Sequence, residues 1–128
     1  MKFTSKIING KEFVAVCKTN QLLEGKGIKI QFEEDDDMQV ALFRINGELY
    51  CLTNICPHRH AEEIYNGIIK DGNVTCPLHG WTYNLKTGYN VNLKQGLKSL
   101  QKYEIFEQNN KVYIEKPPLL IPKWRQIE

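Results

Sequence analysis

Four two-residue turn signals divide this chain into short segments and limit what it can fold into. Asn9-Gly10, Asn46-Gly47, Asp71-Gly72 and Asn109-Asn110 all suit the left-handed backbone of two-residue hairpin loops. Around them lie runs rich in β-branched and aromatic residues: GIKIQF, VALFRI, ELYCLT, GIIK, NVTC, KYEIFE and KVYIEK. No long segment keeps a helical period, and only one short helical turn is expected, at NQLLEG. The sequence therefore predicts an all-β fold, a small antiparallel sandwich or barrel.

Composition narrows the class further. The chain has 128 residues, 41% of them hydrophobic and 25% charged, which is typical of one globular domain. We expect this domain to span residues 1–116, with the proline-containing stretch 117–128 packed on it as an irregular tail. A net charge of +2 gives no indication of nucleic-acid binding.

The expected location is the cytoplasm, away from any membrane. No apolar run reaches the roughly 18 residues of a membrane span, and the N-terminal segment lacks the apolar region of a signal peptide. In that reducing compartment the four cysteines are expected as thiols or metal ligands rather than as disulfides. Cys17 and Cys51 lie in strand-like runs, where they are expected to be buried small apolar side chains.

The remaining two cysteines belong to a pair of matched motifs, CPHRH and CPLHGWTY. The pattern is Cys56-x-His58, then residues 59–75, then Cys76-x-x-His79. A proline follows each cysteine, Pro57 in the first motif, and its fixed φ stiffens the turn. The segment between the motifs reads as a hairpin, so its two ends should bring two thiolates and two imidazoles together.

Two kinds of metal centre suit these four side chains. A mononuclear zinc site can use two cysteines and two histidines. Zinc fingers, however, place both cysteines on one knuckle and both histidines on a helix, whereas each turn here supplies one of each. A two-iron, two-sulfide cluster, with cysteines on one iron and histidines on the other, fits this pattern better. Zinc remains open at this point.

The whole segment CPHRHAEEIYNGIIKDGNVTCPLHGWTYNLKTG resembles the Rieske iron–sulfur family. The resemblance implies the all-β Rieske fold with a cluster-binding hairpin unit and one [2Fe-2S] cluster per chain. It implies that Cys56 and Cys76 bind the inner iron. It also implies that His58 and His79 bind the outer iron near solvent.

Residues around the motifs indicate which branch of the family the chain resembles. High-potential members carry a disulfide between the two loops, but the corresponding positions here are Ala61 and Leu78. Where those members place a serine that donates to a cluster sulfide, this chain has Trp81, while Tyr83 matches a tyrosine whose hydroxyl bonds a ligand cysteine. Hydrogen bonds to sulfur raise the potential, so one missing donor predicts a low-potential type.

The resemblance implies a one-electron carrier of the stand-alone ferredoxin type. It would relay electrons from a reductase to a terminal oxygenase or similar oxidoreductase, with no catalytic site of its own. The small subunit of an assimilatory nitrite reductase is the alternative, and a non-redox metal-binding scaffold is an alternative of another class. If the stretch after the second motif covers the cluster, Lys94, Lys98 and Lys102 form a basic rim that favours an acidic partner; the alternative is that they are ordinary solvated lysines.

Two further features are interpreted as ordinary loop residues. The acidic run EEDDD, residues 33–37, is expected to be a solvated hairpin loop, since it lacks the ligand spacing of a calcium loop. His60, the third histidine, is expected to be an exposed loop residue.

Overall fold

The computed structural model describes residues 4–32, 35–56, 61–78, 80–92 and 98–117. In these residues ten strands form three antiparallel sheets, as the all-β prediction requires. The strands are β1 (Ser5–Ile8), β2 (Lys11–Lys18), β3 (Gly27–Phe32), β4 (Asp35–Ile45), β5 (Glu48–Thr53), β6 (Ile68–Lys70), β7 (Asn73–Thr75), β8 (Thr82–Asn84), β9 (Ile105–Gln108) and β10 (Lys111–Glu115). Two 3-10 turns, η1 (Thr19–Gln21) and η2 (Ile64–Asn66), complete the described secondary structure. None of the helical turns in the described part is long and apolar enough to cross a membrane.

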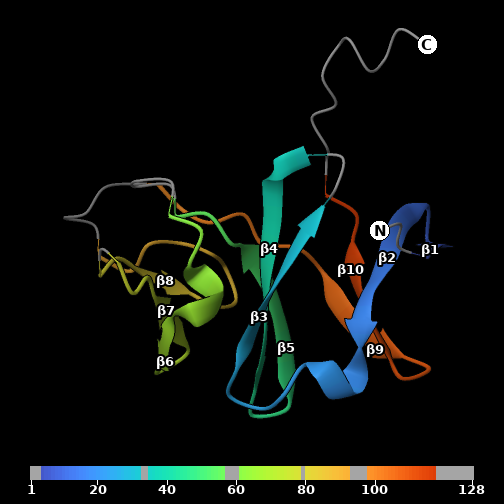
Figure 1. Ribbon diagram of the computed structural model, residues 1–128, viewed down its shortest axis with the longest axis horizontal. Helices are drawn as coiled ribbons and strands as arrows, with labels where there is room; N and C mark the ends of the chain where they lie inside the picture. Colours follow the sequence, from blue (N-terminus) through green and yellow to red (C-terminus); the bar gives the residue numbers. More distant parts are fainter. Residues whose placement is uncertain (1–3, 33–34, 57–60, 79, 93–97, 118–128) are drawn as a thin grey trace, which may run out of the picture.

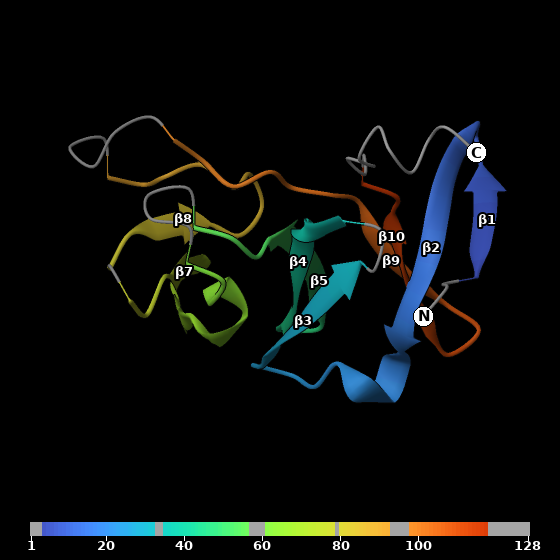
Figure 2. The same ribbon diagram turned by 45° about the horizontal axis from the view of Figure 1, so that its top comes forward.

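The three sheets lie in sequence across the molecule. Their strand orders are β1-β2-β10-β9, β3-β4-β5 and β6-β7-β8. The β3-β4-β5 sheet lies between the other two, and the small β6-β7-β8 sheet stands apart at one end (Figures 1 and 2). The chain enters this small unit after β5 and returns from it to β9 (Figure 1).

All four predicted hairpin turns are confirmed. Each joins two paired strands through two residues with positive φ, for example +53° at Asp71 and +77° at Gly72 between β6 and β7. The other three connect β1 to β2, β4 to β5 and β9 to β10. Positive φ at both central positions is the type I′ geometry that matches the twist of the flanking strands.

The central sheet is buried on both faces, which explains the unbroken apolar run in β4. Val40 and Leu42 pack into a core shared with the β1-β2-β10-β9 sheet. Ala41 and Phe43 point the other way, into a core shared with the β6-β7-β8 unit. Successive side chains of a strand alternate between faces, so β4 serves two cores at once. The second core is the one that holds Cys56 and Cys76.

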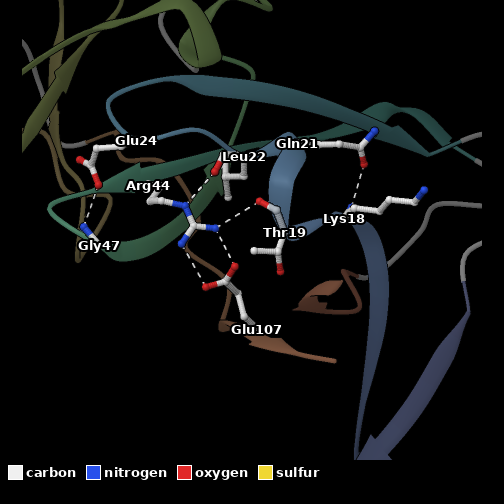
Figure 3. Close-up of polar contacts among 8 residues, drawn as sticks. All are labelled: Lys18, Thr19, Gln21, Leu22, Glu24, Arg44, Gly47 and Glu107. Carbon is white, nitrogen blue, oxygen red and sulfur yellow. Dashed lines mark hydrogen bonds and ion pairs between the residues drawn. The ribbon is translucent and has the colours of Figure 1, made fainter. Parts of the chain in front are cut away.

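Arg44 of β4 joins the central sheet to β9 and to η1 (Figure 3). Its Nη1 and Nη2 atoms donate to both oxygens of Glu107, at 3.0 and 2.6 Å, and its Nε donates to the Leu22 carbonyl at 2.7 Å. The hydrogen bond from Arg44 lowers the pKa of Glu107, so the carboxylate stays charged. A bidentate, charge-assisted contact of this kind fixes the relative orientation of the guanidinium and the carboxylate and also stabilises the fold.

Three smaller expectations have mixed outcomes. The turn at NQLLEG is a 3-10 turn that begins earlier, at Thr19, while Gly25 takes the left-handed φ of +77°. The EEDDD loop prediction was too long, because pairing of Phe32 with Asp35 returns the chain to β4 after residues 33–34. Cys51 is buried as predicted, and Cys17 is half-buried. Burial raises the pKa of Cys17 to about 11 and that of Cys51 above its ordinary value, so both thiols stay protonated.

We predict that Arg44→Met destabilises the protein by roughly 1–3 kcal/mol, because the Leu22 carbonyl and Glu107 lose their donor. The folded-state pKa of Glu107 is lowered, so this stabilisation is present above its unfolded pKa and is lost as pH falls through the folded value. The urea midpoint of the loaded protein, compared between pH 7 and pH 3, measures both effects.

The matched control is Lys11→Met, which removes the ion pairs of the exposed Lys11 with Glu104, at 3.3 Å, and with Glu115, at 3.9 Å. Exposed pairs contribute about 0–1 kcal/mol, so its midpoint should stay close to that of the unmodified protein. Equal losses in both variants would contradict the account of Arg44.

Candidate metal centre

The two motif cysteines lie at the ends of strands and point into one core. Cys56 follows β5 and Cys76 follows β7, and their exposed fractions are 0% and 1%. Both belong to the cluster of side chains packed between the central sheet and the β6-β7-β8 unit. Neither is in a disulfide. The Asp71-Gly72 hairpin between β6 and β7 therefore does what the sequence predicts, since the second cysteine returns to the core that holds the first.

The same backbone contact closes both cysteine loops. The Cys56 N–H donates to the Ala61 carbonyl, and the Cys76 N–H donates to the Trp81 carbonyl, each at 2.8 Å. In the second loop the Gly80 N–H also donates to the Cys76 carbonyl, at 2.9 Å, and Gly80 takes a φ of +74° that favours glycine. Loops 56–61 and 76–81 are thus closed alike, and each contains one of the predicted ligand histidines.

Three predicted site residues lie outside the described residues. These are His58, His79 and Pro57. The structure therefore places the two thiols of the predicted ligand set, and the two imidazoles remain a prediction. Metal-ligating groups of three or more side chains are not found among the residues that the structure describes.

Tyr83 of β8 contacts the first cysteine from the small sheet. Its Oη atom lies 3.4 Å from Cys56 Sγ, and the side chain is fully buried. Burial, and then the hydrogen bond to Cys56, raise the pKa of Tyr83. The hydroxyl therefore keeps its proton and can donate to a sulfur that carries negative charge.

Asn54 holds the first loop in place, and the sequence analysis missed it. It is fully buried, and its Nδ2 donates to Gln39 Oε1 at 3.0 Å and to the Glu62 carbonyl at 3.1 Å. Its Oδ1 accepts the N–H of Tyr65 at 2.8 Å. The Asn54 side chain therefore links Gln39 of β4 to Glu62 and Tyr65, which follow the first cysteine loop. The sequence shows an asparagine two positions before Cys56, but neither its burial nor its partners can be predicted from the sequence.

The structure also describes Ala61, Leu78 and Trp81, the three positions that the sequence analysis compared with the high-potential branch. Ala61 is buried, whereas Leu78 is 60% exposed at the tip of the second loop. Trp81 is half-buried and packs against the core around the cysteines. Trp81 thus supplies packing, together with the carbonyl that closes the second loop.

A small sheet with tight packing supports the two loops. The hydroxyls of Thr75 and Thr82 lie 2.8 Å apart across β7 and β8. A Cβ atom at Gly67 would overlap Val74 and sit 2.8 Å from the Thr75 carbonyl, so only glycine fits where the chain turns into β6. The β6-β7-β8 unit is therefore closely packed next to the point where it presents Cys76.

The family model of the Rieske [2Fe-2S] domain matches residues 12–104 of this chain. The chain belongs to the Rieske [2Fe-2S] family. The match extends from β2 to the residue before β9 and includes both cysteine loops. A Rieske domain carries one [2Fe-2S] cluster, so the mononuclear zinc site left open by the composition of the motifs is no longer favoured.

Known proteins similar to this Rieske chain differ in their overall size. The chain is 32% identical over 100 residues to apoptosis-inducing factor 3 of Homo sapiens, but it spans only 16% of that protein's length. It is 28% identical over 104 residues to the 3-phenylpropionate/cinnamic acid dioxygenase ferredoxin subunit of Escherichia coli (strain K12). That match covers 81% of this chain and 93% of the ferredoxin subunit.

A solved structure confirms the fold. A protein assigned as the NADH-dependent nitrite reductase small subunit of Mycobacterium tuberculosis superposes with a TM-score of 0.71 at 21% identity. The superposition covers 84% of this chain and 96% of the other.

The described residues fit a cluster of this kind. Two buried thiols converge in one core, and a protonated tyrosine hydroxyl already lies beside one of them. Thiolates are the standard ligands of iron–sulfur clusters, and donors to their sulfur atoms tune the potential.

We predict that Asn54→Leu weakens cluster retention, because residues 62 and 65 lose the amide that ties them to β4. The measurement is the rate at which the visible absorbance of the cluster bleaches under a chelator. Asn66→Ala is the control, since Asn66 is exposed and its Nδ2 donates to the nearby Glu63 at 3.2 Å. Bleaching of Asn54→Leu at the unmodified rate would contradict the assigned role of Asn54.

Proposed function

We propose that this protein is a one-electron carrier that takes electrons from a reductase and passes them to a terminal oxygenase or similar oxidoreductase. Membership of the Rieske family supports a redox role. The resemblance over nearly the full length of a dioxygenase ferredoxin subunit supports the oxygenase partner. The observation that carries the proposal is the pair of matching backbone closures at buried Cys56 and Cys76, with the Tyr83 hydroxyl beside Cys56.

The proposed ligands are Cys56 and Cys76 for one iron and His58 and His79 for the other. When bound, the [2Fe-2S] cluster supplies reversible one-electron chemistry. The core around the cysteines excludes water from their sulfur atoms, since both side chains are at most 1% exposed. Tyr83 holds its proton toward Cys56, and the closed loops keep both thiols in place without a large rearrangement.

The proposed potential is that of the low-potential branch. Ala61 and Leu78 leave no disulfide between the loops, and Trp81 offers no hydroxyl where the high-potential members have one. Tyr83 remains as one donor to sulfur. The cytoplasm is the proposed location, consistent with cysteines that are not paired in disulfides. Residues 1–116 are proposed as the domain and 117–128 as its tail.

The second candidate is the small subunit of an assimilatory nitrite reductase. The structural likeness to the Mycobacterium tuberculosis protein supports it, although that likeness concerns the fold. The two candidates differ in the acceptor that the carrier would serve.

The proposed contact surface for an acidic partner is the basic rim, of which the structure describes Lys98 and Lys102, both exposed. Lys86 adds to it, because Lys86 and Lys102 border a groove of about 330 Å³ that also includes Tyr89. Tyr89 is 67% exposed and gives the rim an apolar centre. Basic side chains around an apolar contact favour an acidic protein surface and speed its approach.

We predict that His58→Ala and His79→Ala each abolish the electron paramagnetic resonance signal of the mixed thiolate–imidazole cluster. Far-ultraviolet circular dichroism should still show the strands, because no core side chain of the barrel changes. His60→Ala is the matched control and should keep the signal. A normal signal in either ligand variant would contradict the ligand assignment.

We also predict that reversing the charge of Lys86 and Lys102 to glutamate slows oxidation of the reduced protein by ferricyanide several-fold at low salt. Oxidation by hexaammineruthenium(III) should be accelerated instead, because that oxidant is a cation. Both effects should fade near 1 M salt, where the Debye length is about 3 Å.

The control for this charge reversal is Lys111→Glu, an exposed lysine of β10 outside the small unit. If it changes the two rates as much as the double variant does, the rim has no special role.

A further inference from the structure

One buried amide near the cysteines has no partner among the described residues. Asn90 is 8% exposed, and its Nδ2 atom makes no hydrogen bond in the part of the chain that the structure describes. The orientation of the amide is fixed, because its Oδ1 accepts the N–H of Asn92 at 2.9 Å. A buried N–H₂ group without an acceptor is costly, so its presence indicates a partner that the polypeptide alone does not supply.

The backbone places Asn90 directly beside Tyr83. Tyr83 and Asn90 face each other in an antiparallel bridge. The flanking hydrogen bonds run from the Asn84 N–H to the Tyr89 carbonyl at 2.9 Å and from the Val91 N–H to the Thr82 carbonyl at 3.0 Å. This is the pattern of a non-hydrogen-bonded pair, in which opposite side chains share one face and approach most closely.

That face of the small sheet is the one that carries the cysteines. Val74 pairs with Tyr83 on the other side, and Cys76 follows Val74 by two residues, so both project toward the same core. Tyr83 reaches from this face to Cys56 Sγ. Asn90 therefore adds a polar donor to the face of the small sheet on which Val74 and Tyr83 line the core of the two cysteines.

We propose that the Asn90 side-chain amide donates a hydrogen bond to a sulfur atom of the bound cluster, either a bridging sulfide or a cysteine ligand, and so raises the reduction potential. The bond strengthens when the cluster gains negative charge, so it stabilises the reduced state. Asn90 is thus a tuning residue, and its amide partly replaces the serine hydroxyl that high-potential members have where this chain has Trp81. The inference rests on the proposed function, in which Cys56 and Cys76 hold the cluster.

The test is the midpoint potential of Asn90→Leu, which keeps the size of the side chain and removes the donor. We expect the equilibrium constant for reduction by a fixed donor to fall three- to tenfold, which is about 28–59 mV at 59 mV per tenfold change. Pulsed electron–nuclear double resonance should show an exchangeable deuteron coupling after transfer to D₂O, and Asn90→Leu should lose it. An unchanged potential together with an unchanged coupling would overturn the proposal.

Two further variants complete the test. Thr82→Val removes a side-chain hydrogen bond on the opposite face of the same strand, so it should change neither the potential nor the deuteron coupling. Equal shifts in Thr82→Val and Asn90→Leu would overturn the proposal, because general loosening of the sheet would then explain both. If Asn90→Leu does not load the cluster, Asn90→Ala serves instead, with the same expected loss of the coupling.

Failure of this inference is distinguishable from failure of the proposed function. If the unmodified protein contains two irons and two sulfides but the Asn90 variants keep its potential, only the role of Asn90 is wrong. If the unmodified protein assembles no [2Fe-2S] cluster, the proposed function fails, and the inference fails with it.

Discussion

Two hydrogen bonds from cysteine N–H groups hold the site together. Each cysteine donates to the carbonyl five positions later, Ala61 in one loop and Trp81 in the other. These closures tie each cysteine backbone to the far end of its loop, and both thiols lie in the core. Without them, Cys56 and Cys76 would lie on unsupported turns, and the two sulfur atoms would have no fixed separation.

The rest of the fold keeps Cys56 and Cys76 in one core. The central sheet is buried on both faces, so the core around the cysteines is continuous with a stiff layer. Arg44 fixes that layer to β9 through Glu107, and Asn54 fixes the first loop to β4 through Gln39. A cluster that gains and loses one electron benefits from such rigidity, because little protein rearrangement then accompanies the charge change.

Polar groups aimed at sulfur decide the chemistry of such a site more than its overall shape does. Tyr83 contributes a hydroxyl at 3.4 Å from Cys56 Sγ, and Asn90 contributes an amide on the same face. Trp81 occupies the position where a further donor stands in relatives of high potential. We infer that these three residues together set the reduction potential of this Rieske protein.

Much of this arrangement could be predicted from the sequence, because turns and short motifs are local. The two-residue turns fixed the hairpins, and the Cys-Pro motifs identified the centre. Asn54 and Asn90 could not be found in this way, since their roles depend on strands that pair across the fold. The prediction of a loop over residues 33–37 was too long for the same reason. Asp35 pairs with Phe32 of the neighbouring strand, and local composition does not show this pairing.

The most direct test of the central claim is an electron paramagnetic resonance spectrum of the dithionite-reduced protein, with iron and sulfide counted on the same sample. We expect about two irons and two sulfides per chain and a rhombic signal whose mean g value lies below that of the free electron. A colourless, silent protein that binds zinc after anaerobic reconstitution with iron and sulfide would contradict it.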